Sequence, residues 1–501
     1  MSEAQRKNLG LLEIEKYLRK NENSLANFKK SMPQPDDIEE YTDTNHLILD
    51  ELNYDCDKLA KEHERLLSTI TDEQKQIYDF VMDAVNANAG GMFFVYGYGG
   101  TSKTFLWNVL GAAIRSRGQI VLNVASSGIA ALLLQGGRTA HSRFGIPMAV
   151  NESTFCSISA GSHQAELLER ASLIIWDEAP MMSRHCFETL DRTMRDILRC
   201  DKIFGGKVVV LGGDFRQILP VIPGGGKIET VMASLNSSPL WLECKVMELT
   251  TNMRPLRVSG GIENQEMVDF AKWILDIGNG KINEPNTGEV EIDIPSDLLI
   301  IREGNPLEKI VSEIYGTSYK TTRDAKNFQE RAILSPRNQD VDVINEFMLS
   351  KLTGDAQEYL SSDSIDTSDT SKNDDMVYTQ EYLNSIRVSE LPNHFLKLKI
   401  GAPIMLLRNI HPRGGLCNGT RLLVTRLAKH VIEASHLSGD RIGKTVLIPR
   451  MFVFPPEARF PFRMRRKQFP IAIAFAMTIN KSQGQTLQKG NIEKRTTYFD
   501  N

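Results

Sequence analysis

The sequence predicts an α/β fold with more than one domain, and this prediction rests on three observations. With 501 residues, 41% of them hydrophobic, the chain is longer than one core supports, because single cores stop growing at roughly 250–300 residues. A short apolar strand at 93–95 is followed by a glycine-rich turn and by a helical segment that opens with Lys103. A second buried strand, at 173–176, ends in the carboxylates Asp177 and Glu178.

Composition and charge exclude several classes of protein. A net charge of −4 gives no overall bias towards nucleic acid, so such binding needs local patches. No apolar run reaches the ~20 residues of a membrane span, and residues 1–35 are too mixed in charge for a signal sequence. Six cysteines without a C-x-x-C pair argue against a zinc site and against a disulfide framework, which fits a reducing compartment.

The turn after 93–95 has the layout of a phosphate-binding loop. Its backbone N–H groups can cradle a polyphosphate, Lys103 can reach the terminal phosphates, and the Thr104 hydroxyl can hold Mg²⁺. Ser102 stands where the pattern G-x-x-x-x-G-K-[ST] has glycine, and its Cβ either crowds the phosphate or resists the backbone angles of the loop. The nucleotide-binding residues expected here are Gly97, Gly99, Gly100, Thr101, Ser102, Lys103 and Thr104.

Further polar residues follow the later strands. Asp177 can hold Mg²⁺ through water, and Glu178 can orient the attacking water. Gln217 follows a predicted strand at 208–211 and is placed to sense a γ-phosphate. Residues 249–254 are predicted to form a short strand that delivers Arg254, which either neutralises transition-state charge or is a surface charge.

Two other segments leave alternatives open. Thr71 is a good N-cap for a helix that runs to about Asn86, and Gln74 in its first turn is either a solvated residue or a reader of the adenine edge. The glycine-rich block 136–147 is either an ordinary surface loop or a set of phosphate contacts along a single nucleic-acid strand.

The second half begins after a Pro/Gly/Asn linker at 285–288 and repeats the α/β pattern from about 297, with a strand at 332–334. Residues 354–375 are rich in Ser, Thr and Asp and are expected to be mobile. Short strands between about 396 and 454 indicate a small β-barrel.

Three more features of this region are predicted from its side chains. The helix before the linker, at 263–282, is expected to bury Met267, Phe270, Ala271, Trp273 and Ile274. A buried strand from Pro470 ends in the polar run 478–486. A basic cluster with interleaved phenylalanines is either a solvated face or part of a single-strand channel; it consists of Arg459, Arg463, Arg465, Arg466 and Lys467.

With these blocks assembled, the chain resembles the Pif (petite integration frequency) type of ATP-dependent DNA helicase, in the RecD-like group of superfamily one B, especially its plant and transposon-associated branch. The resemblance runs from about Leu9 to Leu487 and rests on GYGGTSKT, WDEAPM, GGDFRQILPV, LTTNMR and TINKSQGQTL. It implies two RecA-like parallel-sheet domains with ATP and Mg²⁺ between them, and a small SH3/OB-like β-barrel inserted in the second.

The resemblance also implies roles for individual residues. Gln74 would contact adenine, Lys103 the phosphates, and Thr104 and Asp177 the magnesium and its water. Glu178 would be the catalytic base, Gln217 the γ-phosphate sensor and Arg254 an arginine finger. The implied DNA-binding residues are Ser127, Arg138, His141, Ser142, Thr478, Asn480, Lys481, Ser482, Gly484, Gln485 and Thr486.

The implied organisation has four parts. They are an accessory helical segment at 1–60, a first RecA-like domain at 61–285 with a wedge insertion at about 141–165, a second RecA-like domain at 286–350 and 470–501, and a mobile acidic loop with the barrel at 351–469. The family's last motif, a tyrosine-valine-alanine-leucine-serine-arginine run, does not follow TINKSQGQTL, so the second domain is expected to be incomplete.

The implied activity is ATP-driven 5′→3′ movement along single-stranded DNA with unwinding of duplex DNA, in repair, recombination and telomere or genome maintenance. The expected partners are single-stranded and duplex DNA and no membrane, the expected location is the nucleus or the mitochondrion, and the free chain is expected to be a monomer. The alternative is a catalytically impaired remnant that keeps the fold and DNA binding.

Overall fold

The computed structural model describes residues 45–222, 224–253, 265–282, 290–300, 305–316, 325–329, 331–365, 378–388, 391–411, 414–439, 441–455, 460 and 462–485. Before residue 45 it describes 7–8, 10–12, 14–15, 24–28 and 32–35. Arg254, Arg459 and Thr486 lie outside the described residues. Within these ranges, no helix has the length and apolar character that crossing a bilayer requires.

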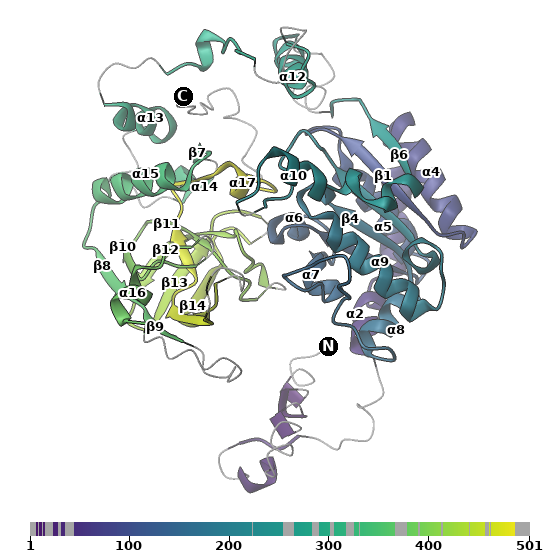
Figure 1. Ribbon diagram of the computed structural model, residues 1–501, viewed down its shortest axis with the longest axis horizontal. Helices are drawn as coiled ribbons and strands as arrows, with labels where there is room; N and C mark the ends of the chain where they lie inside the picture. The colour runs from purple at the N-terminus through teal and green to yellow at the C-terminus, as the bar shows by residue number, and fades with distance from the viewer. Residues whose placement is uncertain are drawn as a thin grey trace.

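A six-stranded sheet with the order β3-β2-β4-β5-β1-β6 organises the first half, on the right in Figure 1, and all of its pairings are parallel. Its central strands are apolar on both faces, as parallel strands covered by helices are. The strands predicted at 93–95, 173–176 and 208–211 are confirmed. The bounds are β1 Gly91–Gly97, β2 Ile120–Ala125, β3 Arg138–Thr139, β4 Ala171–Asp177, β5 Val208–Gly213 and β6 Cys244–Leu249.

Helices cover both faces of this sheet. Phe94 and Trp176 pack into the core under α8 (His163–Arg170) and α9 (Arg184–Leu198). Alternate residues of the same strands pack on the opposite face, under α4 (Asp72–Asn86) and α5 (Lys103–Arg115). The shorter helices are α6 Gly128–Leu132, α7 Ala140–Phe144, η2 Ala179–Met181, η3 Ile203–Gly206, α10 Lys227–Ala233, η4 Leu235–Ser237 and η5 Pro239–Glu243.

The segment before residue 60 also packs on this domain. Helix α2 (His46–Leu52) contributes Ile48 to the core, and its N-cap Asn45 donates a hydrogen bond to the carbonyl of His163 at 2.7 Å. Helix α3 (Cys56–Leu67) lies against α5. From residue 45 onward the segment predicted to be helical, 1–60, is indeed helical, but α3 runs across the boundary placed at residue 60.

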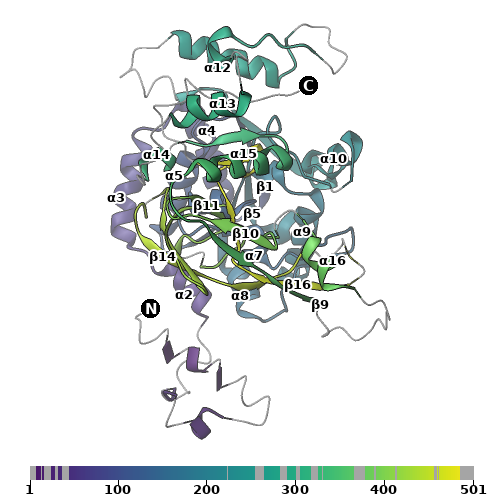
Figure 2. The ribbon, with the colours of Figure 1, turned by 90° about the vertical axis from the view of Figure 1, so that its left-hand side faces the viewer.

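The second half, in front in Figure 2, combines several sheets. A five-stranded antiparallel sheet has the order β14-β13-β12-β11-β17, and smaller sheets pair β15-β16-β9 and β10-β8. A parallel pair, β18-β7, belongs to the second α/β unit. The bounds are β7 Ile333–Ser335, β8 Gln357–Leu360, β9 Ser362–Ile365, β10 Phe395–Leu398, β11 Pro403–Leu406, β12 Arg421–Leu427, β13 Val431–His436, β14 Thr445–Pro449, β15 Met451–Val453, β16 Met464–Gln468, β17 Ile471–Ile473 and β18 Ala476–Thr478.

The helices of this half are mostly short. Helix α15, which is as long as α12, covers one side of the β18-β7 pair. The bounds are α12 Gln265–Gly278, η6 Ser296–Leu298, α13 Pro306–Tyr315, α14 Lys326–Gln329, α15 Asn338–Lys351, α16 Gln380–Ser385 and α17 Ile479–Ser482. One further short turn of helix, η1, spans Leu25–Phe28 near the N-terminus.

Two predicted strands are wrong in their bounds. A strand was predicted at 249–254, but β6 ends at Leu249. The residues that follow leave the sheet because they contact the phosphate loop. The strand predicted from Pro470 to Thr478 is two strands: β17 pairs with β11 in the antiparallel sheet, and β18 pairs with β7. The chain therefore crosses from one sheet to the other at 474–475.

Two predictions about burial and order are also wrong. No residue of α12 is buried in the structure as described, and this helix lies at the upper edge of the molecule in both views (Figures 1 and 2). Residues 357–365, expected to be mobile, form β8 and β9. They are held by the buried side chains of Tyr359 and Asp363, which composition alone does not reveal.

Candidate functional site

The phosphate loop connects the end of β1 to the start of α5. The ammonium group of Lys103 donates a hydrogen bond to the carbonyl of Gly97, so the side chain lies back over the loop. Ser102, the N-cap of α5, has φ 62° and ψ 39°, which is the left-handed region. Because this region costs a non-glycine residue roughly 1–2 kcal/mol, the structure shows why glycine suits this position: the backbone angles demand it.

Carboxylates gather beside the loop. Strands β4, β5 and β1 are neighbours, so Asp177 at the end of β4 and Asp214 just after β5 reach the same edge of the sheet as Gly97. Asp177 is 5% exposed, and its Oδ1 has no hydrogen-bond partner among the described residues. Burial raises the pKa of Asp177 above its ordinary value, and the nearby Lys103 and Trp107 act against this rise.

Glu178 follows directly and is held with φ 53° and ψ 39°. Burial and then the charge of Asp177 raise the pKa of Glu178 to about 7; Asp214 adds to the rise and Lys103 opposes it. A carboxylate with a pKa near neutrality is suited to general-base chemistry at physiological pH. Asp177, Glu178, Asp214 and Lys103 are therefore within electrostatic reach of one another.

Gln74 is not a solvated residue. It is 3% exposed, closes a capping box with Thr71 at the start of α4, and donates from Nε2 to the carbonyl of Thr101 at 3.4 Å. This contact links the first turn of α4 to the phosphate loop. The adenine contact of Gln74 stays a prediction.

Sequence reasoning missed the importance of Asp214, which lies within the GGDFRQILPV block. Asp214 is buried, and its Oδ1 accepts a hydrogen bond from the backbone N–H of Arg216 at 3.1 Å. Three residues later, Gln217 accepts a hydrogen bond from Gln483 in the other half of the molecule, at 3.5 Å. The segment after β5 therefore joins the carboxylate cluster to the segment that follows α17.

The first group of residues predicted to bind DNA lies on three neighbouring elements. Ser127 caps α6 through the N–H of Ala130, Arg138 is in β3, and His141 and Ser142 are in α7. Strand β3 pairs with β2, which also contacts α6. Burial lowers the pKa of His141, so its ring is neutral near pH 7. The block 136–147 contains β3 and α7, and three residues of α7 are buried, so it is not an ordinary surface loop; its contacts with a nucleic-acid strand stay a prediction.

The second group of predicted DNA-binding residues lies beside the first, next to α6. Thr478 precedes α17, which contains Asn480, Lys481 and Ser482, and Gly484 and Gln485 follow it. Gly484 lies so close to α6 that a Cβ there would be 3.1 Å from the backbone nitrogen of Ala130. Both groups therefore meet at α6, and their roles in binding DNA stay predictions.

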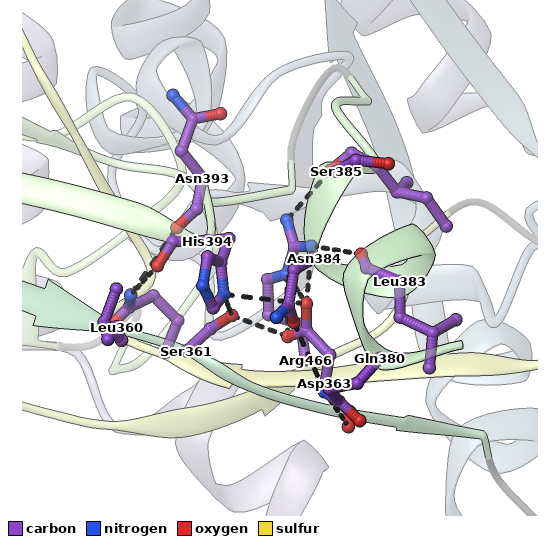
Figure 3. A network of polar contacts seen from close by, with 12 residues as sticks. Leu360, Ser361, Asp363, Gln380, Leu383, Asn384, Ser385, Asn393, His394 and Arg466 are labelled. Carbon is purple, nitrogen blue, oxygen red and sulfur yellow. Dashed lines mark hydrogen bonds and ion pairs between the residues drawn. The ribbon is translucent and has the colours of Figure 1, made fainter. Parts of the chain in front are cut away.

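The basic cluster contains one residue that fits neither predicted alternative. Arg466 is 0% exposed and donates two hydrogen bonds from Nε and one from Nη2 to the carboxylate of Asp363, between 2.7 and 3.0 Å. Its remaining donors reach the carbonyls of Leu383, Ile386 and Pro392. Figure 3 shows Arg466 between Asp363 and Leu383. Arg466 is a structural residue because a guanidinium with all of these partners has no free face for DNA.

Comparisons with known proteins agree with this arrangement. The family described as PIF1-like helicase matches residues 69–288, and the DNA helicase Pif1 2B domain matches 381–427. The ATP-dependent DNA helicase PIF1 of Danio rerio is 26% identical over 423 residues, covering 83% of this chain and 56% of that protein. The human PIF1 is 26% identical over 407 residues, covering 79% and 53%. The chain thus spans about half the length of these relatives.

Solved structures share the fold. A Bacteroides Pif1 helicase in complex with ADP-AlF3 and single-stranded DNA has a TM-score of 0.55 at 23% identity, covering 83% of this chain and 84% of that one. The Pif1 helicase of Candida albicans has a TM-score of 0.53 at 20% identity, covering 84% and 88%.

The matched regions correspond to the parts described above. The first covers the sheet, the phosphate loop and the carboxylates, and the second falls on α16 and the strands β10 to β12 of the small domain. The narrower assignment to the plant and transposon-associated branch stays a prediction. On its motifs, its fold and both matches, the chain belongs to the Pif1-like helicase family.

Proposed function

We propose that this chain is an ATP-dependent DNA helicase that couples ATP hydrolysis to 5′→3′ movement along single-stranded DNA and to duplex unwinding. The proposal rests above all on one observation: Lys103, Asp177 and Glu178 meet at one edge of the first sheet, beside a phosphate loop. Relatives named as ATP-dependent DNA helicases, and a Bacteroides Pif1 solved with ADP-AlF3 and single-stranded DNA, support it.

In the proposed mechanism, the backbone N–H groups of the loop and the ammonium of Lys103 bind the β- and γ-phosphates. The site fits Mg²⁺, because Thr104 offers a hydroxyl and the buried Oδ1 of Asp177 lacks a hydrogen-bond partner among the described residues, which a metal-bound water would supply. Bound Mg²⁺ would neutralise charge on the phosphates. Glu178 accepts the proton of the attacking water.

The remaining roles belong to the same proposal. Gln217 senses the γ-phosphate, and its hydrogen bond with Gln483 couples the presence of that phosphate to the second half of the chain. Arg254 stabilises charge that develops in the transition state. The residues around α6, α7 and α17 hold the DNA strand. We place the protein in the nucleus or the mitochondrion, in genome maintenance, and propose that it is a monomer when free.

The test compares ATP hydrolysis with and without single-stranded DNA, together with unwinding of duplexes that carry a 5′ or a 3′ tail. We expect stimulation by DNA and unwinding of the 5′-tailed substrate. Lys103→Ala should lower the rate by about 100-fold or more, because it removes a charge that stabilises the transition state. Lys61→Ala removes the same charge from an exposed position on α3 and should change nothing. Equal rates for the wild type and Lys103→Ala would refute the proposal.

One observation favours a second candidate, the impaired remnant: Ser102 has a left-handed conformation that opposes a side chain. If the loop is impaired for this reason, Ser102→Gly should raise a low rate of ATP hydrolysis. Ser116→Gly, at the other end of α5 with φ −61°, is the matched control and should not raise it. A wild-type chain already as fast as Ser102→Gly would contradict the remnant.

A further inference from the structure

The first turn of α4 holds two separate parts of the site through adjacent residues. Gln74 donates to the carbonyl of Thr101 in the phosphate loop, as described above. Its neighbour Glu73 points to the segment that follows β6. The Glu73 carboxylate accepts hydrogen bonds from the backbone N–H of Thr250 at 3.0 Å and of Thr251 at 3.3 Å, and a third from the Thr250 hydroxyl.

The same segment is tied to the phosphate loop from its other side. The Tyr98 hydroxyl donates to the carbonyl of Thr250 at 2.6 Å, and the backbone N–H of Met253 donates to the carbonyl of Gly100 at 2.9 Å. Upstream, Leu249 pairs with Gly97 at the end of β1. Residues 250–253 therefore form a strap that runs along the loop from the edge of the sheet.

The carboxylate of Glu73, in α4, binds this strap through hydrogen bonds. Burial acts to raise the pKa of Glu73, but the hydrogen bonds from Thr250 and Thr251 outweigh it, so the pKa is lowered and the group is ionised at neutral pH. Hydrogen bonds to a charged acceptor are roughly twice as strong as neutral ones. The strap thus ends in a fixed position at Met253, one residue before Arg254.

We propose that Glu73 is a positioning residue that holds the strap 250–253 against the phosphate loop and so supports the contribution to ATP hydrolysis of Arg254, which follows the strap in the sequence. This inference rests on the proposed function. Because Glu73 and Gln74 are adjacent in the first turn of α4, this one turn contacts both the loop and the strap. Glu73 acts through Arg254 and does not itself touch the phosphates.

The kinetic test uses the whole chain with Glu73→Ala, Glu73→Gln, Asp72→Ala and Arg254→Ala. Glu73→Ala should lower kcat by about 10- to 100-fold with KM for ATP little changed, since small displacements of catalytic groups cost this much. Glu73→Gln keeps an acceptor and the shape and should restore most of the rate. Asp72→Ala removes an exposed carboxylate from the same turn and should behave as wild type.

A double substitution separates positioning from a general loss of structure. If Glu73 acts through Arg254, the Glu73→Ala/Arg254→Ala chain should be no slower than Arg254→Ala alone. Independent, multiplying losses would overturn the inference, as would a Glu73→Ala chain with wild-type kcat.

Amide hydrogen exchange provides a readout that needs no activity. Glu73→Ala should speed exchange at the amides of Thr250 and Thr251, whereas Asp72→Ala should not. Unchanged exchange at both amides would refute the strap. If the wild-type chain hydrolyses no ATP while Glu73→Ala still speeds exchange at these two amides, the proposed function is refuted and the strap remains supported.

Discussion

The Glu178 carboxyl group predicts a pH dependence of catalysis. Because burial and the neighbouring Asp177 raise the pKa of Glu178 to about 7, the base is largely protonated below that pH. We expect kcat/KM for ATP to fall about tenfold per pH unit below the pKa, since kcat/KM reports the ionisation of the free enzyme. The measurement is a kcat/KM profile from acidic to alkaline pH. Asp214→Asn should move the acidic limb of this profile to lower pH, because the charge of Asp214 contributes to the raised pKa of Glu178. An acidic limb near the ordinary glutamate pKa of 4.5 would contradict the role of Glu178 as the base.

The same group affects stability with a defined sign. Between pH 4.5 and about 7 the folded state binds a proton that the unfolded state has released, so the free energy of unfolding should decrease as pH rises through this window. The shift of the pKa corresponds to on the order of 3 kcal/mol. Denaturant titrations at both ends of this pH window measure the decrease in the free energy of unfolding. Glu178→Gln is the control, because its amide does not titrate in this window and its decrease should be smaller.

Single residues of the site differ in how far the sequence reveals them. Lys103, Asp177 and Glu178 could be predicted because each follows an apolar strand, and parallel strands end at one edge of a sheet. Glu73 could not, because its partner Thr250 is 177 residues away and nothing local marks the contact. The left-handed angles of Ser102 were one of two alternatives that the missing glycine suggested, and the structure shows them.

At the level of elements, the sequence predicts strands with continuous apolar runs and fails where order depends on distant polar partners. Strands β1, β2, β4 and β5 are buried on both faces, so their apolar character is visible locally. Strand β9 contains Ser362, Asp363 and Ser364 and resembles a mobile acidic segment. It is ordered because Asp363 meets Arg466, 103 residues away.

This pairing predicts that the small domain depends on Asp363. Asp363→Ala leaves the guanidinium of Arg466 buried without its counter-charge, and removing one partner of a buried ion pair costs about 3–5 kcal/mol. The free energy of unfolding should fall by this amount in denaturant titrations. Asp355→Ala, at an exposed position before β8, is the control and should change stability little. A small effect of Asp363→Ala would mean that the pair does not hold β9 to β16.

At the level of the whole molecule, α6 of the first half touches the second half at two places. A Cβ at Gly128 would lie 3.2 Å from the carbonyl of Asn418, and Gly484 faces Ala130. Gln485 donates from Nε2 to the carbonyl of Gly419 at 3.4 Å, which joins these two places to each other. The predicted DNA-binding segments therefore approach one another only because small residues allow it.

Gly484→Ala tests whether this close approach matters for DNA binding. The added Cβ would be 3.1 Å from the Ala130 nitrogen, and φ of 73° disfavours any side chain, so α17 should be displaced from α6. We expect affinity for single-stranded DNA to fall by about fivefold or more, with basal ATP binding retained, because the nucleotide loop is untouched. Gly439→Ala has nearly the same backbone angle, φ 77°, but its Cβ meets no described atom within 4 Å, so it reports the backbone strain alone. Fluorescence anisotropy measures the DNA affinity of both variants. Equal affinities would show that the contact of Gly484 with α6 is not required for binding single-stranded DNA.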